Sequence, residues 1–215
     1  MDILLTDKEI RVLGCLMEKE MATPDYYPFS LNALTNACNQ KSNRNPVVSY
    51  DEETVAYALN GLRERKLARE SNISRVPKYE QTFSKDLNLI VREEAIVCIL
   101  LVRGPQTIGE IRNRTERLYA FSSLDEVQEA ITRLEHMELI SKLPRQLGHK
   151  ESRYVHLLSE EPQETIVVVP RPEADAVIDR KENVRMDELQ KQIDELRQEM
   201  QRLQLEFETF KSQFD

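Results

Sequence analysis

Hydrophobic positions follow the same course twice along the chain. Within residues 9–67, apolar side chains recur every three or four positions in three successive stretches, a spacing typical of helices that bury one face. The three stretches return within residues 92–139, where Cys98 takes the place of Cys15 and Thr107 the place of Ser30. A repeat of this length indicates two structural units of one type.

The last helix of each copy shows the agreement most clearly. Its apolar positions are Val55, Ala58, Leu59 and Leu62 in the first copy and Val127, Ala130, Ile131 and Leu134 in the second. Turn-forming residues then divide residues 67–83 and residues 139–157 into two extended stretches each, which predicts two β-hairpins. Three helices and a hairpin are the outline of a winged helix, a helix-turn-helix variant. The sequence thus predicts an α+β fold, mainly α with small β-hairpins, with tandem winged-helix domains at residues 1–84 and 85–169.

Two local patterns refine this prediction. Thr6 and Glu9 have the spacing of a capping box, which places the start of the first helix there. Residues 96–101 are apolar on nearly all sides of a helix, so we expect the first helix of the second copy to be buried on more than one side.

A different pattern begins after residue 158. The β-branched run 166–169 predicts a strand added to the edge of the second hairpin, and residues 170–184 predict a charged linker. From residue 185 to residue 215 the apolar residues keep a heptad spacing, which predicts a C-terminal coiled-coil helix. Its predicted dimerisation residues are Leu189, Ile193, Leu196, Met200, Leu203, Phe207 and Phe210. We expect this helix to form a homodimer. The alternatives are that it packs against another protein or folds back onto the chain's own domains.

The net charge of −8 is distributed unevenly. Residues 1–159 hold 22 Lys and Arg against 23 Asp and Glu, whereas residues 160–215 hold 8 against 15. The acidity therefore belongs to the tail, and it does not exclude an anionic partner for the repeated units. The chain has no apolar run long enough to span a bilayer, and its first residues do not form a secretion signal, so we expect a cytoplasmic protein without membrane contact.

Candidate chemistry for an enzyme is sparse. The three cysteines form no Cys-x-x-Cys pair, and Cys15 and Cys98 fall on apolar helix positions, which predicts core packing. The three histidines lack metal-ligand spacing, and the five glycines form no phosphate-binding loop. We therefore expect a non-enzymatic protein with no cofactor and no metal.

Several motifs are more specific than the fold class. They are residues 13–19 (LGCLMEK), 30–34 (SLNAL) and 37–44 (ACNQKSNR) in the first copy, and 103–107 (RGPQT) and 143–146 (LPRQ) in the second. With these motifs the chain resembles the YceH family of uncharacterised bacterial proteins over roughly residues 5–158. The resemblance implies tandem winged-helix domains in a bacterial cytoplasmic protein, and it implies no established function.

Nucleic-acid binding needs positive charge in the right place. Helix-turn-helix proteins usually put the start of the third helix into the DNA major groove. Here those starts are acidic, with residues 51–53 (DEE) in the first copy and Asp125 and Glu126 in the second, and carboxylates repel phosphates. Positive charge lies instead on and beside the hairpins, where it could grip the DNA backbone without reading its sequence. The candidate nucleic-acid-binding residues are Lys41, Arg44, Arg75, Lys78, Arg145, Lys150 and Arg153.

Two functions follow from these observations. The first is a DNA-associated, regulatory protein that holds the backbone through basic wings. The alternative is a protein-interaction adaptor, since the segregation and condensation subunits of chromosomes use tandem winged helices in that way. Charged hairpins are also common as solvated strand edges that prevent pairing with other chains, so the sequence leaves both functions open.

The two copies differ in length. The offset between equivalent residues falls from 83 at Cys15 and Cys98 to 72 at Leu67 and Leu139, so the first copy holds 11 additional residues. These insertions lie within residues 21–29 and 39–50, which include motifs of the family resemblance. We expect any specific site to lie there.

Overall fold

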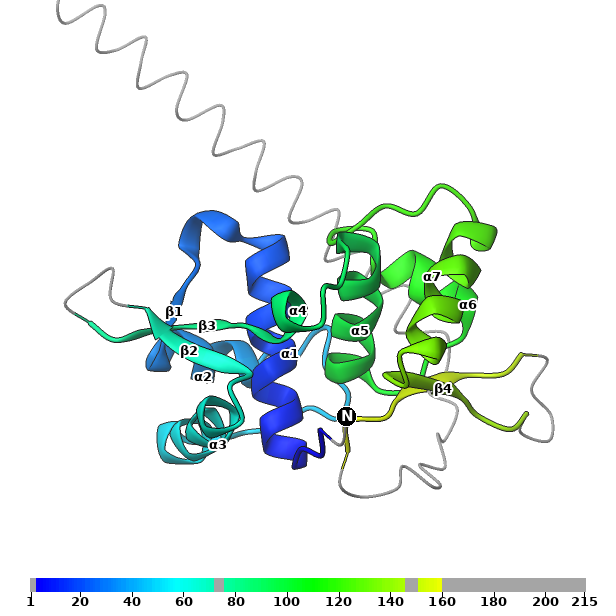
Figure 1. The fold of residues 1–215 in the computed structure, drawn as a ribbon. Helices are drawn as coiled ribbons and strands as arrows, with labels where there is room; N and C mark the ends of the chain where they lie inside the picture. The colour runs from blue at the N-terminus through cyan, green and yellow to red at the C-terminus, as the bar shows by residue number, and fades with distance from the viewer. Residues whose placement is uncertain (1–2, 72–75, 146–150, 160–215) are drawn as a thin grey trace, which may run out of the picture. The chain divides into compact units, whose positions relative to one another are not determined.

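The computed structural model describes residues 3–71, 76–145 and 151–159 of the chain. In these ranges, helices pack together in the centre and small antiparallel sheets lie to either side (Figure 1), which confirms the predicted α+β class. The elements of the first copy are α1 (Asp7–Ala22), the 3-10 turn η1 (Pro24–Tyr26), β1 (Phe29–Ser30), α2 (Leu31–Cys38), α3 (Glu52–Glu64), β2 (Ala68–Ser71) and β3 (Lys78–Gln81). Those that follow are α4 (Phe83–Asp86), α5 (Val91–Arg103), α6 (Ile108–Arg114), α7 (Leu124–His136), β4 (Ile140–Lys142) and β5 (Tyr154–His156).

Each copy carries its own small sheet. The first has the order β1-β3-β2, with Tyr79 opposite Phe29 on one side and opposite Glu70 on the other. The second sheet pairs β4 with β5. Gln106 forms a β-bridge with Tyr154 at the position that corresponds to the pairing of β1 with β3 in the first copy. The chain therefore repeats one order of helices and extended segments, as the hydrophobic pattern predicts.

Side-chain caps fix the starts of the helices. Thr6 Oγ1 accepts a hydrogen bond from the Glu9 N–H (3.4 Å), and Glu9 Oε2 accepts one from the Thr6 N–H (2.9 Å), so the predicted capping box is confirmed. Asp51 caps α3 and Ser123 caps α7. Such caps satisfy backbone N–H groups that have no partner inside the helix.

The two copies meet through the same helix of each. Helices α1 and α5 lie side by side in the centre of Figure 1, and one continuous hydrophobic core includes residues from both copies. Residues 95–102 of α5 are all buried, which confirms the predicted burial on more than one side. Cys15 and Cys98 are buried, as expected for core residues. Residues on both sides of the predicted boundary at 84 and 85 thus share one core, and separate copies would expose the apolar surface between α1 and α5. The domain boundary itself stays a prediction.

After the second sheet, the chain runs beside the residues that precede α1. The Leu5 N–H donates to the Leu158 carbonyl (2.8 Å), and Leu5 forms a parallel bridge with Ser159. The predicted strand at 166–169, the linker at 170–184 and the coiled coil at 185–215 lie outside the described residues. So do all seven predicted dimerisation residues.

Gly14 marks the closest approach of α1 and α5, and replacing it by alanine is expected to destabilise the fold by about 1–3 kcal/mol. A Cβ atom at Gly14 would lie 2.8 Å from Val102 Cγ1 and 2.9 Å from Leu101 Cβ, so the helices would have to move apart. Urea unfolding measures the change. Gly109→Ala is the matched control, because a Cβ there meets nothing within 4 Å. Equal stability of the two variants would contradict tight packing at Gly14.

Candidate functional site

The loop of residues 39–50 was the first expected location of a specific site. Its two ends are fastened together, because the Asn39 side chain donates to the Tyr50 carbonyl and accepts from the Tyr50 N–H, both at 2.7 Å. Arg44 points inward from this loop, and its side chain is fully buried. The loop is therefore an ordered part of the fold with an arginine at its centre.

Arg44 forms an ion pair with Glu18 of α1. Its Nη1 lies 2.9 Å from Glu18 Oε1 and its Nη2 lies 2.5 Å from Glu18 Oε2, while Nε and Nη2 also donate to the Ala37 carbonyl. Burial by itself would raise the pKa of Glu18, but the hydrogen bonds and charge of Arg44 outweigh it and lower that pKa. Arg44 was expected to contact nucleic acid. That expectation is corrected, because a buried guanidinium held by a carboxylate cannot reach a phosphate.

The same loop holds the second copy of the repeat. The Asn45 N–H donates to the Val102 carbonyl at 2.9 Å, and Arg103 donates to the Asn43 side chain. Asn43 has a φ of 59°, a conformation that asparagine tolerates better than most residues. The insertion therefore joins the end of α5 to the first copy.

The insertion at residues 21–29 contacts β3 of its own copy, close to the start of α5. The Gln81 N–H donates to the Tyr27 hydroxyl at 2.7 Å, and Gln81 Nε2 donates to Glu20 (2.7 Å) and to Glu94 (3.2 Å). Burial raises the pKa of Glu94, with Glu20 adding to it and a hydrogen bond from Ser84 opposing it. The 39–50 insertion thus bonds to the second copy directly, whereas the 21–29 insertion contacts Gln81, which makes the bond to Glu94. Spacing along one chain reveals neither role.

The other predicted nucleic-acid-binding residues that the structure describes lie on separate segments of the chain. Lys41 and Arg145 are exposed and Lys78 is half-buried on β3. Arg153 is half-buried, and its Nη1 donates at 2.8 Å to both the Pro105 carbonyl and Glu110 Oε2. Arg75 and Lys150 lie outside the described residues. Only Lys41, Lys78 and Arg145 therefore remain as described, accessible members of the set, and they come from three separate segments.

Most other arginines around the first sheet also have carboxylate partners. Arg65 lies 2.7 Å from Glu9, and Arg69 lies 2.7 Å from Glu80. Arg63 of α3 lies 3.4 Å from Glu70 and 5.9 Å from the centre of the Tyr79 ring. These pairs reduce the positive field that the sequence places on the first wing.

The outward face of α3 has a different character. Its first turn carries Glu52 and Glu53, both exposed, and Glu52 accepts a hydrogen bond from Asn32 of α2 (2.9 Å). Tyr57 follows in the middle of the helix and is 81% exposed, the highest value among the large hydrophobic residues of the described chain. The helical spacing of the buried residues Val55, Ala58, Leu59 and Leu62 leaves Tyr57 on the outward side, but it gives no sign that the ring would remain so uncovered.

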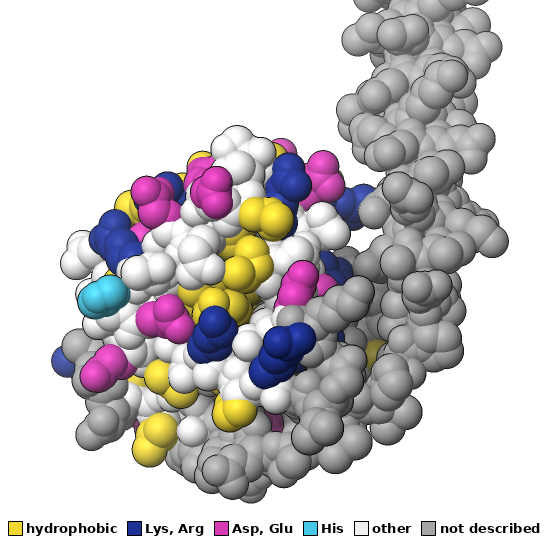
Figure 2. All heavy atoms as spheres, turned by 90° about the vertical axis from the view of Figure 1, so that its right-hand side faces the viewer, with side chains coloured by type: hydrophobic (Ala, Val, Ile, Leu, Met, Phe, Trp, Pro, Cys, Tyr) yellow, Lys and Arg dark blue, Asp and Glu magenta, His cyan; other side chains and the backbone are white. Residues whose placement is uncertain are grey.

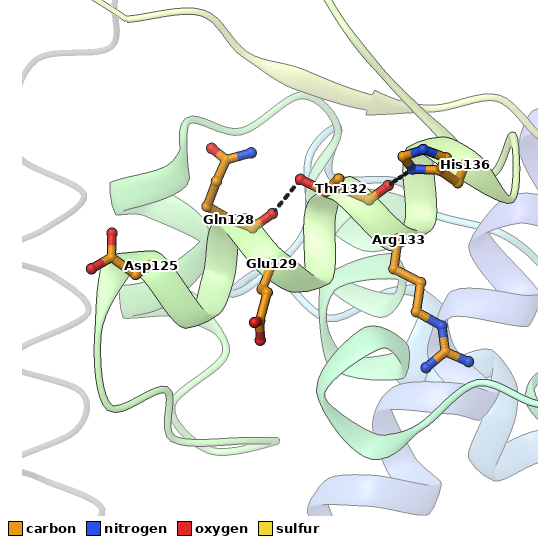
Figure 3. A pocket seen from close by; sticks show the side chains of 6 residues that line it. All are labelled: Asp125, Gln128, Glu129, Thr132, Arg133 and His136. Carbon is orange, nitrogen blue, oxygen red and sulfur yellow. Dashed lines mark hydrogen bonds between the residues drawn. The ribbon is translucent and has the colours of Figure 1, made fainter.

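Helix α7 presents the equivalent face in the second copy. A shallow, open hollow along it is lined by Asp125, Gln128, Glu129, Thr132, Arg133 and His136 (Figure 3). Glu129 is bonded to Arg92 (3.2 Å), and Arg133 to the buried Glu93 (3.2 Å). Around this side of the molecule, basic and acidic side chains alternate about a central hydrophobic area, with no patch of a single sign (Figure 2).

Groups for catalysis or metal binding do not converge in the described ranges. No three His, Cys, Asp or Glu side chains there are placed so that they could hold a metal ion. His156 of β5 is buried, His136 is exposed on α7, and His149 lies outside the described residues. No described helix combines the length and the apolar character needed to cross a bilayer.

Fold and surface together define the class: an α+β protein with an internal repeat, whose two copies share one core beneath charged and polar surfaces. A family model described as a protein of unknown function, DUF480, matches residues 5–149. UPF0502 proteins of Geotalea daltonii and Geotalea uraniireducens are 50% and 47% identical to the chain, and each match covers the full length of this chain and of the relative. A UPF0502 protein of Solibacter usitatus is 57% identical over 160 residues, which cover 74% of this chain and 78% of the relative.

The chain therefore belongs to the DUF480 (UPF0502) family of uncharacterised bacterial proteins. This finding confirms the family resemblance that the sequence motifs carry.

Proposed function

We propose that this protein is a tandem winged-helix scaffold that binds other proteins. The order α1, β1, α2, α3, β2, β3 is that of a winged helix with three strands. The order α5, Gln106, α6, α7, β4, β5 repeats it, with Gln106 at the position of the first strand. In this assignment α3 and α7 are the helices that would enter a DNA groove.

The observation that carries the proposal is the acidic start of α3 in that position. Glu52 and Glu53 are exposed where a groove-binding helix would meet phosphates. Arg44, Arg69 and Arg153 give no free positive charge in compensation, because each is held by a carboxylate. A surface of this kind favours a protein partner over the DNA association that the sequence first suggests.

The C-terminal residues complete the proposal. A homodimeric coiled coil at residues 185–215 would hold two scaffolds together and present two copies of each surface. Linked sites of this kind raise the effective affinity for a partner that carries two matching segments.

DNA binding is expected to be absent. Full-length protein at concentrations up to about 10 µM should give no saturable change in the anisotropy of a labelled 30-base-pair duplex in 50 mM salt, where backbone contacts are strongest. It should also elute from a heparin column at a salt concentration below about 200 mM. The control is a Glu52→Lys/Glu53→Lys variant, whose α3 carries positive charge and should bind the duplex more strongly than the natural chain. A wild-type dissociation constant that rises about 1,000-fold between 50 and 200 mM salt would contradict the scaffold proposal.

A further inference from the structure

Tyr57 is a large aromatic side chain left open in the middle of a helix face. Glu53 lies one helical turn before it and Asn60 one turn after it, so these three residues form a single outward stripe on α3. The neighbouring positions Ala56 and Gly61 carry little side chain, and the ring keeps 81% of its surface exposed. An exposed ring flanked by carboxylates offers both a flat π face and negative charge to a cation.

On the neighbouring hairpin, an aromatic ring and a carboxylate already contact an arginine of the same chain. The Arg63 guanidinium lies 5.9 Å from the centre of the Tyr79 ring, and its Nη2 is 3.4 Å from Glu70. Tyrosine, arginine and glutamate thus meet on the surface of this fold. Tyr57 and Glu53 provide two of these three groups. Arg63 donates to Asn60 of the same stripe (3.2 Å), and among the described residues no arginine stacks on the Tyr57 ring.

The second copy carries ion pairs on the equivalent face in place of an exposed aromatic ring. At an offset of 72 residues, Glu129 takes the place of Tyr57 and is bonded to Arg92 at 3.2 Å. Arg133 takes the place of Gly61 and is bonded to Glu93 at 3.2 Å. The open aromatic face on α3 is therefore a property of the first copy, not a consequence of the shared fold.

We propose that the stripe of Glu53, Tyr57 and Asn60 binds an arginine side chain in a basic segment of a partner protein. The inference rests on the proposed scaffold function, which it deepens by naming the surface and the chemistry of the partner. The guanidinium stacks on the Tyr57 ring and donates to the Glu53 carboxylate, with Glu52 adding to the attraction. Arginine fits better than lysine, because its planar fork both stacks on an aromatic ring and meets a carboxylate with two hydrogen bonds.

A set of defined peptides tests this inference on the full-length chain. The probe is a fluorescein-labelled 12-residue peptide with four arginines separated by glycine and serine, and its partners carry lysine or glutamate at the same four positions. In 150 mM salt, anisotropy should show the arginine peptide binding several-fold more tightly than the lysine peptide, and the glutamate peptide should not bind. Tyr57→Ala should weaken binding of the arginine peptide about tenfold, and Glu53→Gln should weaken it less.

Tyr26→Ala is the matched control, because Tyr26 is 76% exposed in η1 and lies outside the stripe. Its affinity should stay within about twofold of the natural chain. Equal losses in the two tyrosine variants, equal affinities for arginine and lysine peptides, or no binding of the arginine peptide would overturn the inference and leave the scaffold proposal standing. Saturable binding of the labelled duplex by the natural chain would overturn both.

Discussion

Replacing Arg44 by leucine is expected to lower the free energy of unfolding by about 3–5 kcal/mol. The substitution leaves the Glu18 carboxylate, whose side chain is only 11% exposed, without the guanidinium that lies 2.5 Å and 2.9 Å from its two oxygens. The Ala37 carbonyl loses its donors at the same time. Urea unfolding at pH 7.5, followed by far-ultraviolet circular dichroism, measures the change.

Two further variants separate the ion pair from a general effect of losing an arginine. Arg69→Leu removes a pair whose arginine is 63% exposed, so a change of at most about 1 kcal/mol is expected. Glu18→Leu/Arg44→Leu removes both charges and should be less destabilised than Arg44→Leu, because the single variant keeps a buried carboxylate whose remaining partner is Lys19 at 3.4 Å. A single Arg44 variant as stable as Arg69→Leu would show that the buried pair does not hold the loop.

Stability is also expected to fall by about 2 kcal/mol between pH 7.5 and pH 5 because of one histidine. Burial lowers the pKa of His156 to about 4, from the 6.5 of an exposed histidine. Between these values the unfolded chain binds a proton that the folded chain does not, so stability is fully present above about pH 6.5 and declines as the pH falls. Each pH unit between the two pKa values changes the free energy of unfolding by about 1.4 kcal/mol, and the loss of stability ends near pH 4.

Comparison with a His156→Leu variant isolates this contribution, since carboxylates such as Glu94 titrate in both proteins. Urea unfolding at pH 7.5, 6 and 5 should show a pH dependence about 2 kcal/mol smaller in the variant. His136→Gln is the control: His136 is exposed on α7, and its replacement should leave the full dependence. The same slope in natural chain and His156→Leu would refute the assignment.

These two predictions concern the groups that make one body from two copies. Arg44 holds the loop that bonds to Val102, and His156 lies in the sheet from which the chain returns to Leu5. In the scaffold proposal these contacts matter, because they place the exposed face of α3 and the face of α7 on one compact unit.

Helix positions, caps and the repeat could be predicted because they depend on neighbours in the chain. A period of 3.6 residues shows which side of a helix is buried, and the Thr6 and Glu9 capping box involves groups only three residues apart. The apolar character of residues 96–101 even indicated that α5 is covered on several sides. The pattern did not say what covers it, since α1 lies more than 80 residues earlier in the chain.

The candidate site was harder to predict. The basic residues were chosen by charge, yet Arg44 is buried against Glu18, 26 residues away in sequence, and Arg153 is held by Glu110, 43 residues away. Loops have no period from which the direction of a side chain follows. The sequence therefore shows which charged groups are present, whereas the ion pairs formed in the folded chain decide which of them can contact another molecule.

The sequence by itself determined the helices, the hairpins, the repeat and the family, because each rests on local spacing or on the identity of residues. Only the tertiary structure decided that the 39–50 loop of the first copy fastens the second copy, that Arg44 is an internal group, and that Tyr57 stays uncovered. The physical reason is that burial and ion pairing are set by contacts between segments far apart in the chain, and the period of a single segment carries no record of them.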